Sequence, residues 1–243
     1  MEVIVDSITN DEDNLIRQQE KWEAVIQKTL DTDTIAIDYL TDQLQFQFLY
    51  EHKIEFTNDD ILIAVNTVIE TLENITIPQI RRLLKNNNSL KNVASSNIPQ
   101  YSNFALAVIC VPEKLANSNT SFTYQELGYE LLPDTKSDGS AYKFGENHGN
   151  LAMLVDLASI TKKNNLKAFT TSVLTKKYCH LENKEKMELL QRLCFRIPII
   201  QHSVVTPNPK KTVDTYLSQH LSQATISRRR SNVLDILDFA LGD

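Results

Sequence analysis

Three consecutive arginines, Arg228, Arg229 and Arg230, occupy the first turn and a half of a predicted C-terminal helix. A guanidinium group can donate two parallel hydrogen bonds to guanine or to phosphate, and the free N–H groups at a helix start add affinity for anions. Positive charge at this end opposes the helix macrodipole by about 0.3–1 kcal/mol per group, so stability alone does not favour three arginines there. The cluster therefore indicates a site for a polyanion, or else ion pairs with the acidic N-terminal half of the chain.

A second group of polar and basic side chains lies in the segment 143–177. Glu146, Asn147 and His148 open a predicted helix, where they could contact bases or phosphates, or could cap the helix beside a surface histidine. Lysines flank a predicted β-ribbon after that helix and suit phosphate contacts, although a solvated ribbon would carry them equally well. The predicted DNA-contacting residues are Lys143, Glu146, Asn147, His148, Asn150, Lys162, Lys163, Lys167, Lys176, Lys177, Thr225, Ser227, Arg228, Arg229 and Arg230.

One loose constellation could hold a catalytic metal ion. Asp38 is followed by Glu51 and Lys53, an order compatible with Mg²⁺-dependent DNA cleavage, which needs carboxylates to bind the metal and a lysine nearby. Because residues 1–135 contain 21 carboxylates, this spacing also arises by chance, and a solvated acidic face is the alternative. No phosphate-binding loop, zinc-protease motif or serine-hydrolase motif occurs, and the five histidines have no metal-ligand spacing. No cofactor is expected, except Mg²⁺ if the chain is a nuclease.

Charge is distributed unevenly along the chain, whose net charge is −6. Residues 1–135 hold 9 Lys+Arg against 21 Asp+Glu, a net charge of −12. Residues 136–232 hold 16 against 7, a net charge of +9, and the last eleven residues carry −3. A chain polarised in this way usually presents its basic half to a polyanion, although an acidic domain beside a neutralising one also fits these counts.

The elements that must position these groups are predicted to be mostly helices, because the chain has only five glycines and few alternating apolar runs. Residues 59–73 form an amphipathic helix, and Thr76 caps a second helix with Pro78 in its first turn. The Asn- and Ser-rich segment 87–102 is predicted to be a linker. We therefore predict an acidic N-terminal helical domain over residues 1–90, which could itself be winged-helix-like.

A winged helix-turn-helix unit is predicted for residues 101–182. An apolar helix from Phe104 onward precedes a helix whose start, Thr123 followed by Glu126, has the form of a capping box. Residues 133–145 are expected to form the next turn.

The third helix of this unit is predicted to begin at Glu146 and to end near residue 160. The segment 161–178 then turns at Asn164 and Asn165, as a two-stranded ribbon would. In a winged helix-turn-helix, the third helix is the one expected to enter the DNA major groove.

A C-terminal helix-turn-helix unit is predicted for residues 183–243. Its first helix is expected to stop at Pro198, its second covers residues 212–221, and its third, over residues 225–241, carries the three arginines. The predicted fold class is mainly α with short β wings, in tandem winged helix-turn-helix units.

Three short motifs of the chain resemble winged-helix domains of type II restriction endonucleases and of related defence-associated proteins. The resemblance covers about residues 141–240 and implies that the chain recognises a DNA sequence or shape for a restriction–modification or other antiphage defence system. The matching residues are Asn147, His148, Gly149, Asn150, Leu151 and Ala152 in the first motif; Arg196, Ile197, Pro198, Ile200 and Gln201 in the second; and Thr225, Ile226, Arg228, Arg229, Ser231 and Val233 in the third.

The chain also departs from that family. Where the family's ribbon ends in a glycine after Leu-Thr, this chain has Lys176 and Lys177, and Ile236 and Phe239 stand where the family often has tryptophan. Both differences weaken any transfer of individual DNA contacts.

Three classes of function are left open by the sequence. The chain could read double-stranded DNA for a defence system, cleave it as a type II restriction endonuclease with Asp38, Glu51 and Lys53, or act as a protein–protein adaptor or transcriptional regulator. The acidic N-terminal part around Trp22 is expected to be a protein-partner or homodimer surface, or to pack internally.

The cellular setting is predicted from what the sequence lacks. The three cysteines are never spaced as CxxC, so reduced thiols are expected and no structural metal is predicted. No apolar run approaches the roughly 18–20 residues of a membrane helix, and the N-terminus has no signal-peptide pattern. A cytoplasmic protein without a membrane partner is expected.

Overall fold

The computed structural model describes residues 74–86, 90–118, 120–134 and 137–242. The chain divides into two compact units, Met1–Leu90 and Lys91–Asp243. The described part of the first unit contains helix α5 (Ile77–Asn86), and the predicted start at Thr76 is confirmed because its hydroxyl accepts from the Gln79 N–H at 3.4 Å. The predicted helix over residues 59–73, the Trp22 segment and the Asp38, Glu51 and Lys53 constellation lie outside the described residues.

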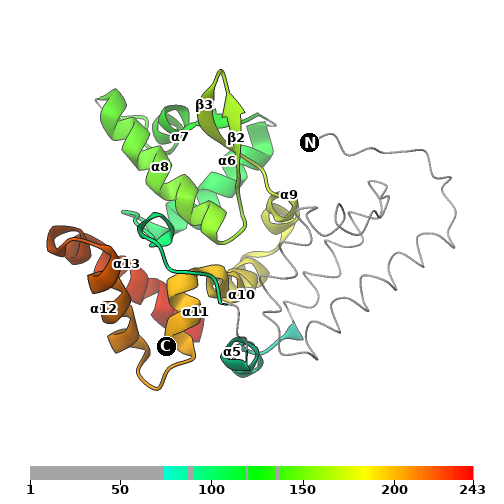
Figure 1. Ribbon diagram of the computed structural model, residues 1–243. Coiled ribbons are helices and arrows are strands. Elements are labelled where there is room, and N and C mark those ends of the chain that lie inside the picture. Colours follow the sequence, from blue (N-terminus) through cyan, green and yellow to red (C-terminus); the bar gives the residue numbers. More distant parts are fainter. Residues whose placement is uncertain (1–73, 87–89, 119, 135–136, 243) are drawn as a thin grey trace, which may run out of the picture. The chain divides into compact units, whose positions relative to one another are not determined.

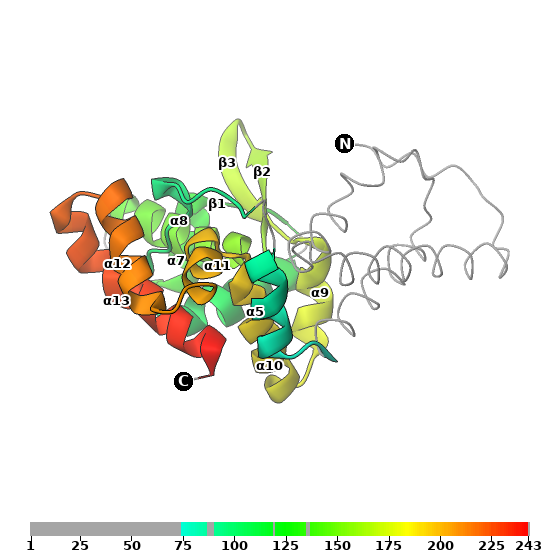
Figure 2. The same cartoon turned by 60° about the horizontal axis from the view of Figure 1, so that its bottom comes forward.

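The first half of the second unit has the element order helix, strand, helix, helix, hairpin, helix (Figures 1 and 2). After a 3-10 turn (Ser95–Asn97), the elements are a π-helical stretch Leu106–Cys110 continuing into α6 (Val111–Ser118), β1 (Phe122–Thr123), α7 (Tyr124–Leu131), α8 (Asp138–Leu154), β2 (Ser159–Lys163), β3 (Leu166–Thr170) and α9 (Val173–His180). The strands form an antiparallel sheet with β3 between β1 and β2. The predicted turn at Asn164 and Asn165 is confirmed, since both have the positive φ that a tight hairpin turn requires.

The second half of this unit contains helices joined by short turns, and no strand among its described residues. It contains α10 (Asn183–Leu193), a 3-10 turn (Cys194–Arg196), α11 (Pro198–Val204), α12 (Pro209–His220) and α13 (Gln223–Leu241). For the part of the chain that the structure describes, the prediction of a mainly helical fold with a short β-hairpin is therefore confirmed. The prediction that Pro198 stops a long helix is corrected: the helix ends at Leu193, and Pro198 begins α11, where its missing N–H costs nothing.

Helix α8 begins eight residues before the predicted start at Glu146. Its N-cap is Ser137, whose hydroxyl accepts from the Ser140 N–H at 3.3 Å. The Gly, Ser and Asp residues of this stretch are typical of a turn, which is why the sequence predicts one there. Gly145, however, lies inside the helix and is required by packing, because a Cβ there would lie 1.9 Å from the Tyr124 carbonyl oxygen where α7 crosses α8.

The β-ribbon is shorter than predicted at its far end. Residues expected to continue it form helix α9 instead, and Ser172 and Thr175 hydrogen-bond to each other at its start. Lys176 and Lys177 therefore lie on a helix and do not flank the hairpin.

The boundary between the two units, at Leu90 and Lys91, falls inside the segment predicted as a linker. The rest of that segment is packed into the second unit, with Val93, Ile98 and Pro99 buried. The prediction that residues 91–102 are part of a linker is therefore wrong. Division of the second unit at residues 182 and 183 stays a prediction.

Two apolar clusters form the core of the second unit and are joined by a buried ion pair. One cluster lies between α6, α7, α8 and β3 and includes Leu115, Leu127 and Phe169. The other is built from buried leucine, isoleucine, valine and phenylalanine side chains of α10 to α13. Between them, Arg196 bridges Asp156 at 2.7 Å, with both side chains at least nine-tenths buried. This pair connects the end of α8 to the α10–α11 corner. Removing either partner would leave an uncompensated buried charge, so both segments must keep these positions in the folded protein.

Candidate nucleic-acid interface

A groove of about 780 Å³ runs between helix α8, the β2–β3 hairpin, the segment 95–100 and the start of α13. Seven of the predicted DNA-contacting residues line it, although they come from positions as far apart as 143 and 229: Lys143, Glu146, Asn147, Asn150, Lys167, Arg228 and Arg229. The fold thus brings together two groups of residues that the sequence presents as separate.

Helix α8 turns one face to the groove and the other to the core. Lys143, Asn147, Asn150 and Leu154 follow helical spacing along the groove. The opposite side is seated on the hairpin through Gly149, where a Cβ would lie only 2.1 Å from the Phe169 ring. The close approach fixes where the polar face of α8 stands relative to the strands.

The β2–β3 hairpin presents two lysines on the sheet face that borders the groove, and a third lysine on the opposite face makes an ion pair. Lys162 and Lys167 are paired in register, so they project to the same face of the sheet as Ile160, which lines the groove. Both lysines are exposed and make no ion pair within the described residues. Lys163 faces the other side and bridges Glu126 of α7 at 2.8 Å.

Arg228 is the arginine of the triplet that is available to a ligand. Its side chain is exposed, lines the groove, and makes a single weak bond to its own helix, from Nε to the Ala224 carbonyl at 3.4 Å. No carboxylate of the described residues pairs with it.

Arg229 holds the neighbouring wall of the groove. Its Nε donates to Gln100 Oε1 at 3.0 Å, and its Nη1 donates to the carbonyls of Ser95 (2.9 Å) and Ile98 (3.0 Å). Partial burial, followed by the charge of Arg228, lowers the pKa of this guanidinium. Arg229 is thus committed to fixing the segment 95–100.

Arg230 is committed to an ion pair at the surface. It binds both carboxylate oxygens of Asp214 on α12, at 2.6 and 3.1 Å, and does not line the groove. The three adjacent arginines therefore have three different environments, although they form one cluster in the sequence.

His148 is also a structural residue and does not face the groove. It is buried, its Nδ1 donates to the Phe144 carbonyl at 2.8 Å, and its Nε2 therefore accepts from the Ser102 hydroxyl at 3.3 Å. Burial lowers the pKa of His148, and the bond to Phe144 acts in the opposite direction. The predicted contact of His148 with DNA does not agree with this position.

The remaining predicted residues lie around the groove or away from it. Lys143 and Glu146 pair with each other at 2.6 Å. Thr225 shares a hydrogen bond with Ser222 at the start of α13, and Ser227 donates to the Gln223 carbonyl. Lys176 and Lys177 on α9 do not line the groove, and Lys176 lines a separate hollow beside α6.

Sequence reasoning missed the wall formed by residues 95–100. Ser96, Asn97 and Gln100 line the groove, yet a run of Asn and Ser is typical of a linker. The neighbouring pair Ile98 and Pro99, both buried, was the apolar signal that this stretch could be packed.

The second unit is the basic part of the chain. Residues 91–243 hold 18 Lys+Arg against 14 Asp+Glu, a net charge of +4, whereas residues 1–90 carry −10. Among the described residues, no group of three His, Cys, Asp or Glu side chains is placed to hold a metal ion. In that same part of the chain no helix combines the length and apolarity that crossing a membrane requires.

Cys110, Cys179 and Cys194 are free thiols, as predicted. Burial raises the pKa of Cys179 to about 11, which leaves it a poor nucleophile.

No known protein family, curated protein or solved structure matches this chain.

Proposed function

We propose that the chain binds double-stranded DNA in the groove between α8, the β2–β3 hairpin and the start of α13. The observation that carries this proposal is the convergence of Asn147, Asn150, Lys167 and Arg228 on one groove from three elements. Asparagine can read adenine bidentately, arginine can read guanine or hold phosphate, and lysine suits phosphate. These side chains together form both parts of a DNA reader, positioning groups and reading groups.

The architecture supports α8 as the recognition helix of a winged helix-turn-helix. The order of α6, β1, α7, α8, β2 and β3, with β3 central in the sheet, is the order of that motif. The hairpin is then the wing, and Lys162 and Lys167 are its phosphate contacts. Service in a restriction–modification or other antiphage defence system is part of the proposal and rests on the resemblance of the three short motifs.

Unpaired cations are the energetic reason to expect binding. Arg228, Lys162 and Lys167 have no ion-pair partner to lose among the described residues, so a phosphate gains their full attraction. Each contact of this kind releases condensed counterions. It therefore makes the slope of log K against the logarithm of the salt concentration more negative by about 0.9.

The test is a fluorescence-anisotropy titration of duplex DNA at two salt concentrations. Arg228→Ala is expected to weaken binding by about 1–3 kcal/mol and to reduce the salt slope by about 1. Arg230→Ala is the matched control, because it removes the same charge two residues away from a side chain already paired with Asp214. Equal affinity for all three proteins, or no salt-sensitive binding by any, would rule out this groove as the DNA site.

A further inference from the structure

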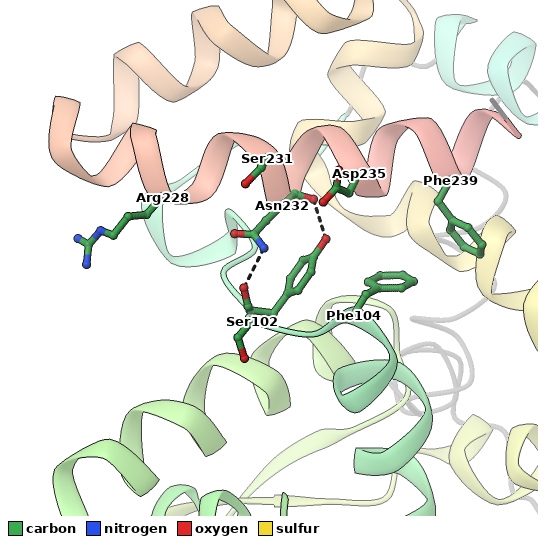
Figure 3. Close-up of a pocket in the computed structure, with 8 residues that line it drawn as sticks. Ser102, Phe104, Arg228, Ser231, Asn232, Asp235 and Phe239 are labelled. Atoms are coloured by element: carbon green, nitrogen blue, oxygen red, sulfur yellow. Dashed lines mark hydrogen bonds between the residues drawn. The ribbon is translucent and has the colours of Figure 1, made fainter. Parts of the chain in front are cut away.

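A second hollow, of about 500 Å³, lies next to the groove, and Arg228 lines both. Its floor is formed by α13 and by the segment that carries Ser102 and Phe104 (Figure 3). Arg228, Asn232, Asp235 and Phe239 follow each other at intervals of three to four residues, which puts them along one face of α13. The hollow is thus a continuation of the groove past Arg228.

One end of the hollow is aromatic. Phe104 and Phe239 meet edge to face with ring centroids 5.5 Å apart, and the Tyr101 ring lies 5.7 Å from Phe104. A flat, apolar ligand could lie against these rings.

Beyond Arg228, the hollow offers several hydrogen-bond acceptors. Asn232 and Tyr101 are tied together, because the Asn232 amide donates to the Tyr101 carbonyl at 2.8 Å and the Tyr101 hydroxyl donates to the Asn232 carbonyl at 2.9 Å. The side-chain oxygen of Asn232 is left over to accept. Asp235 and Ser231 are exposed and make no hydrogen bond or ion pair within the described residues, although the charge of Asp235 acts on the nearby Tyr101 hydroxyl.

The charge of Asp235 decides which part of a nucleic acid could enter. A phosphate would be repelled by this carboxylate, whereas an N–H donor at the edge of a nucleobase would be attracted, as a carboxylate accepts from the amino group of cytosine. Arg228, at the mouth, suits the phosphate of the same nucleotide. The arrangement is therefore cationic at the entrance, acceptor-rich along one side and aromatic at the far end.

We propose that this hollow receives a single unstacked nucleobase of the DNA held in the groove, with Asp235 accepting from the edge of the base. The proposal rests on the proposed function, since Arg228 must hold the strand for a base to reach the hollow. Taking a base out of its stack is costly, and the cost is smallest for a base that is already unpaired.

The experiment compares three duplexes of the same sequence by anisotropy: one fully paired, one with a single bulged cytosine, and one with an abasic nucleotide at the bulge. The abasic bulge is as flexible as the cytosine bulge but offers no base. The full chain is expected to bind the cytosine bulge about tenfold more tightly than the abasic bulge.

Two variants separate the hollow from the groove. Asp235→Ala removes the acceptor, and Ser231→Phe fills the hollow from an exposed position. Both are expected to bind the fully paired duplex as the unaltered protein does and to bind the two bulges equally. Thermal melting of each variant checks that it is folded.

Each other outcome has a definite meaning. Equal binding of both bulges by the unaltered protein would overturn the base-binding hollow while leaving DNA binding intact, and so would a cytosine preference that persists in both variants. Absence of binding to every duplex would refute the proposed function, and this inference would fall with it.

Discussion

Replacing Arg229 by alanine is the substitution whose effect on stability follows most directly from the structure. The change removes three hydrogen bonds from one guanidinium to Gln100 and to the carbonyls of Ser95 and Ile98. The Ser95 carbonyl is at the exposed end and can be rehydrated, so two partly buried bonds remain to be counted. At about 1–1.5 kcal/mol each, the upper part of the range for a typical intramolecular hydrogen bond, the expected loss is about 2–3 kcal/mol.

The neighbouring arginines provide matched controls for this number. Arg230→Ala breaks an exposed ion pair with Asp214 and is expected to lower stability much less than Arg229→Ala does, because solvent screens the two charges. Arg228→Ala removes a positive charge from a helix start and from beside Arg229, so it is expected to be neutral or slightly stabilising.

The assay is thermal or urea unfolding of the full chain, followed by helical circular dichroism. A loss of 2–3 kcal/mol corresponds to a melting temperature lower by about 5–10 °C for a unit of this size. Arg229→Lys is expected to recover little of it, because an ammonium group cannot reach three acceptors in a fixed fork. If Arg229→Ala and Arg230→Ala melted at the same temperature, the assignment of Arg229 to the groove wall would be refuted.

Three further predictions concern α8 and the hairpin. Gly149→Ala is expected to lower stability by about 1–3 kcal/mol, because the new methyl group would overlap the Phe169 ring, and a normal melting temperature would contradict this packing. Because burial lowers the pKa of His148 in the folded protein, the histidine of the unfolded chain takes up its proton at a higher pH as the pH falls. The contribution of neutral His148 to stability should therefore be fully present above about pH 6.5 and be lost as the pH falls below it. Between about pH 7.5 and 5.5, the melting temperature of His148→Gln should drop less than that of the unaltered protein. Lys167→Ala is expected to reduce the salt slope of DNA binding by about 1, whereas Lys163→Ala, which removes a lysine already paired on the other face, should leave it nearly unchanged.

Local signals predicted the elements that depend on local chemistry. The capping box of Thr123 and Glu126 is present, with the Glu126 carboxylate accepting from the Thr123 N–H at 2.8 Å. The hairpin turn at Asn164 and Asn165 was predictable for the same reason, since few residues other than asparagine and glycine tolerate positive φ. Such features need no information from the rest of the chain.

The errors occurred where tertiary contacts override local preference. Gly145 looks like a turn residue, but it lies inside α8 because α7 crosses there too closely for a side chain. Ser95 belongs to a stretch with linker composition, yet its carbonyl is bound by an arginine 134 residues later in the chain. Neither partner could be identified from one sequence.

The different environments of the three arginines also explain why charge counting was insufficient. Positive charge at a helix start indicates an anion site, and Arg228 agrees with that expectation, but Arg229 donates to carbonyls and Arg230 pairs with a carboxylate.

The roles of Arg228 and Arg229 are coupled, because the wall held by Arg229 is one side of the groove that Arg228 lines. Arg229→Ala should therefore weaken DNA binding without changing the salt slope, since it disturbs the wall and removes no phosphate contact. Arg228→Ala should also weaken DNA binding, but it should reduce the salt slope, and the protein should keep its normal stability. If both variants lowered the slope equally, Arg229 would have to leave its carbonyls and bind phosphate in the complex.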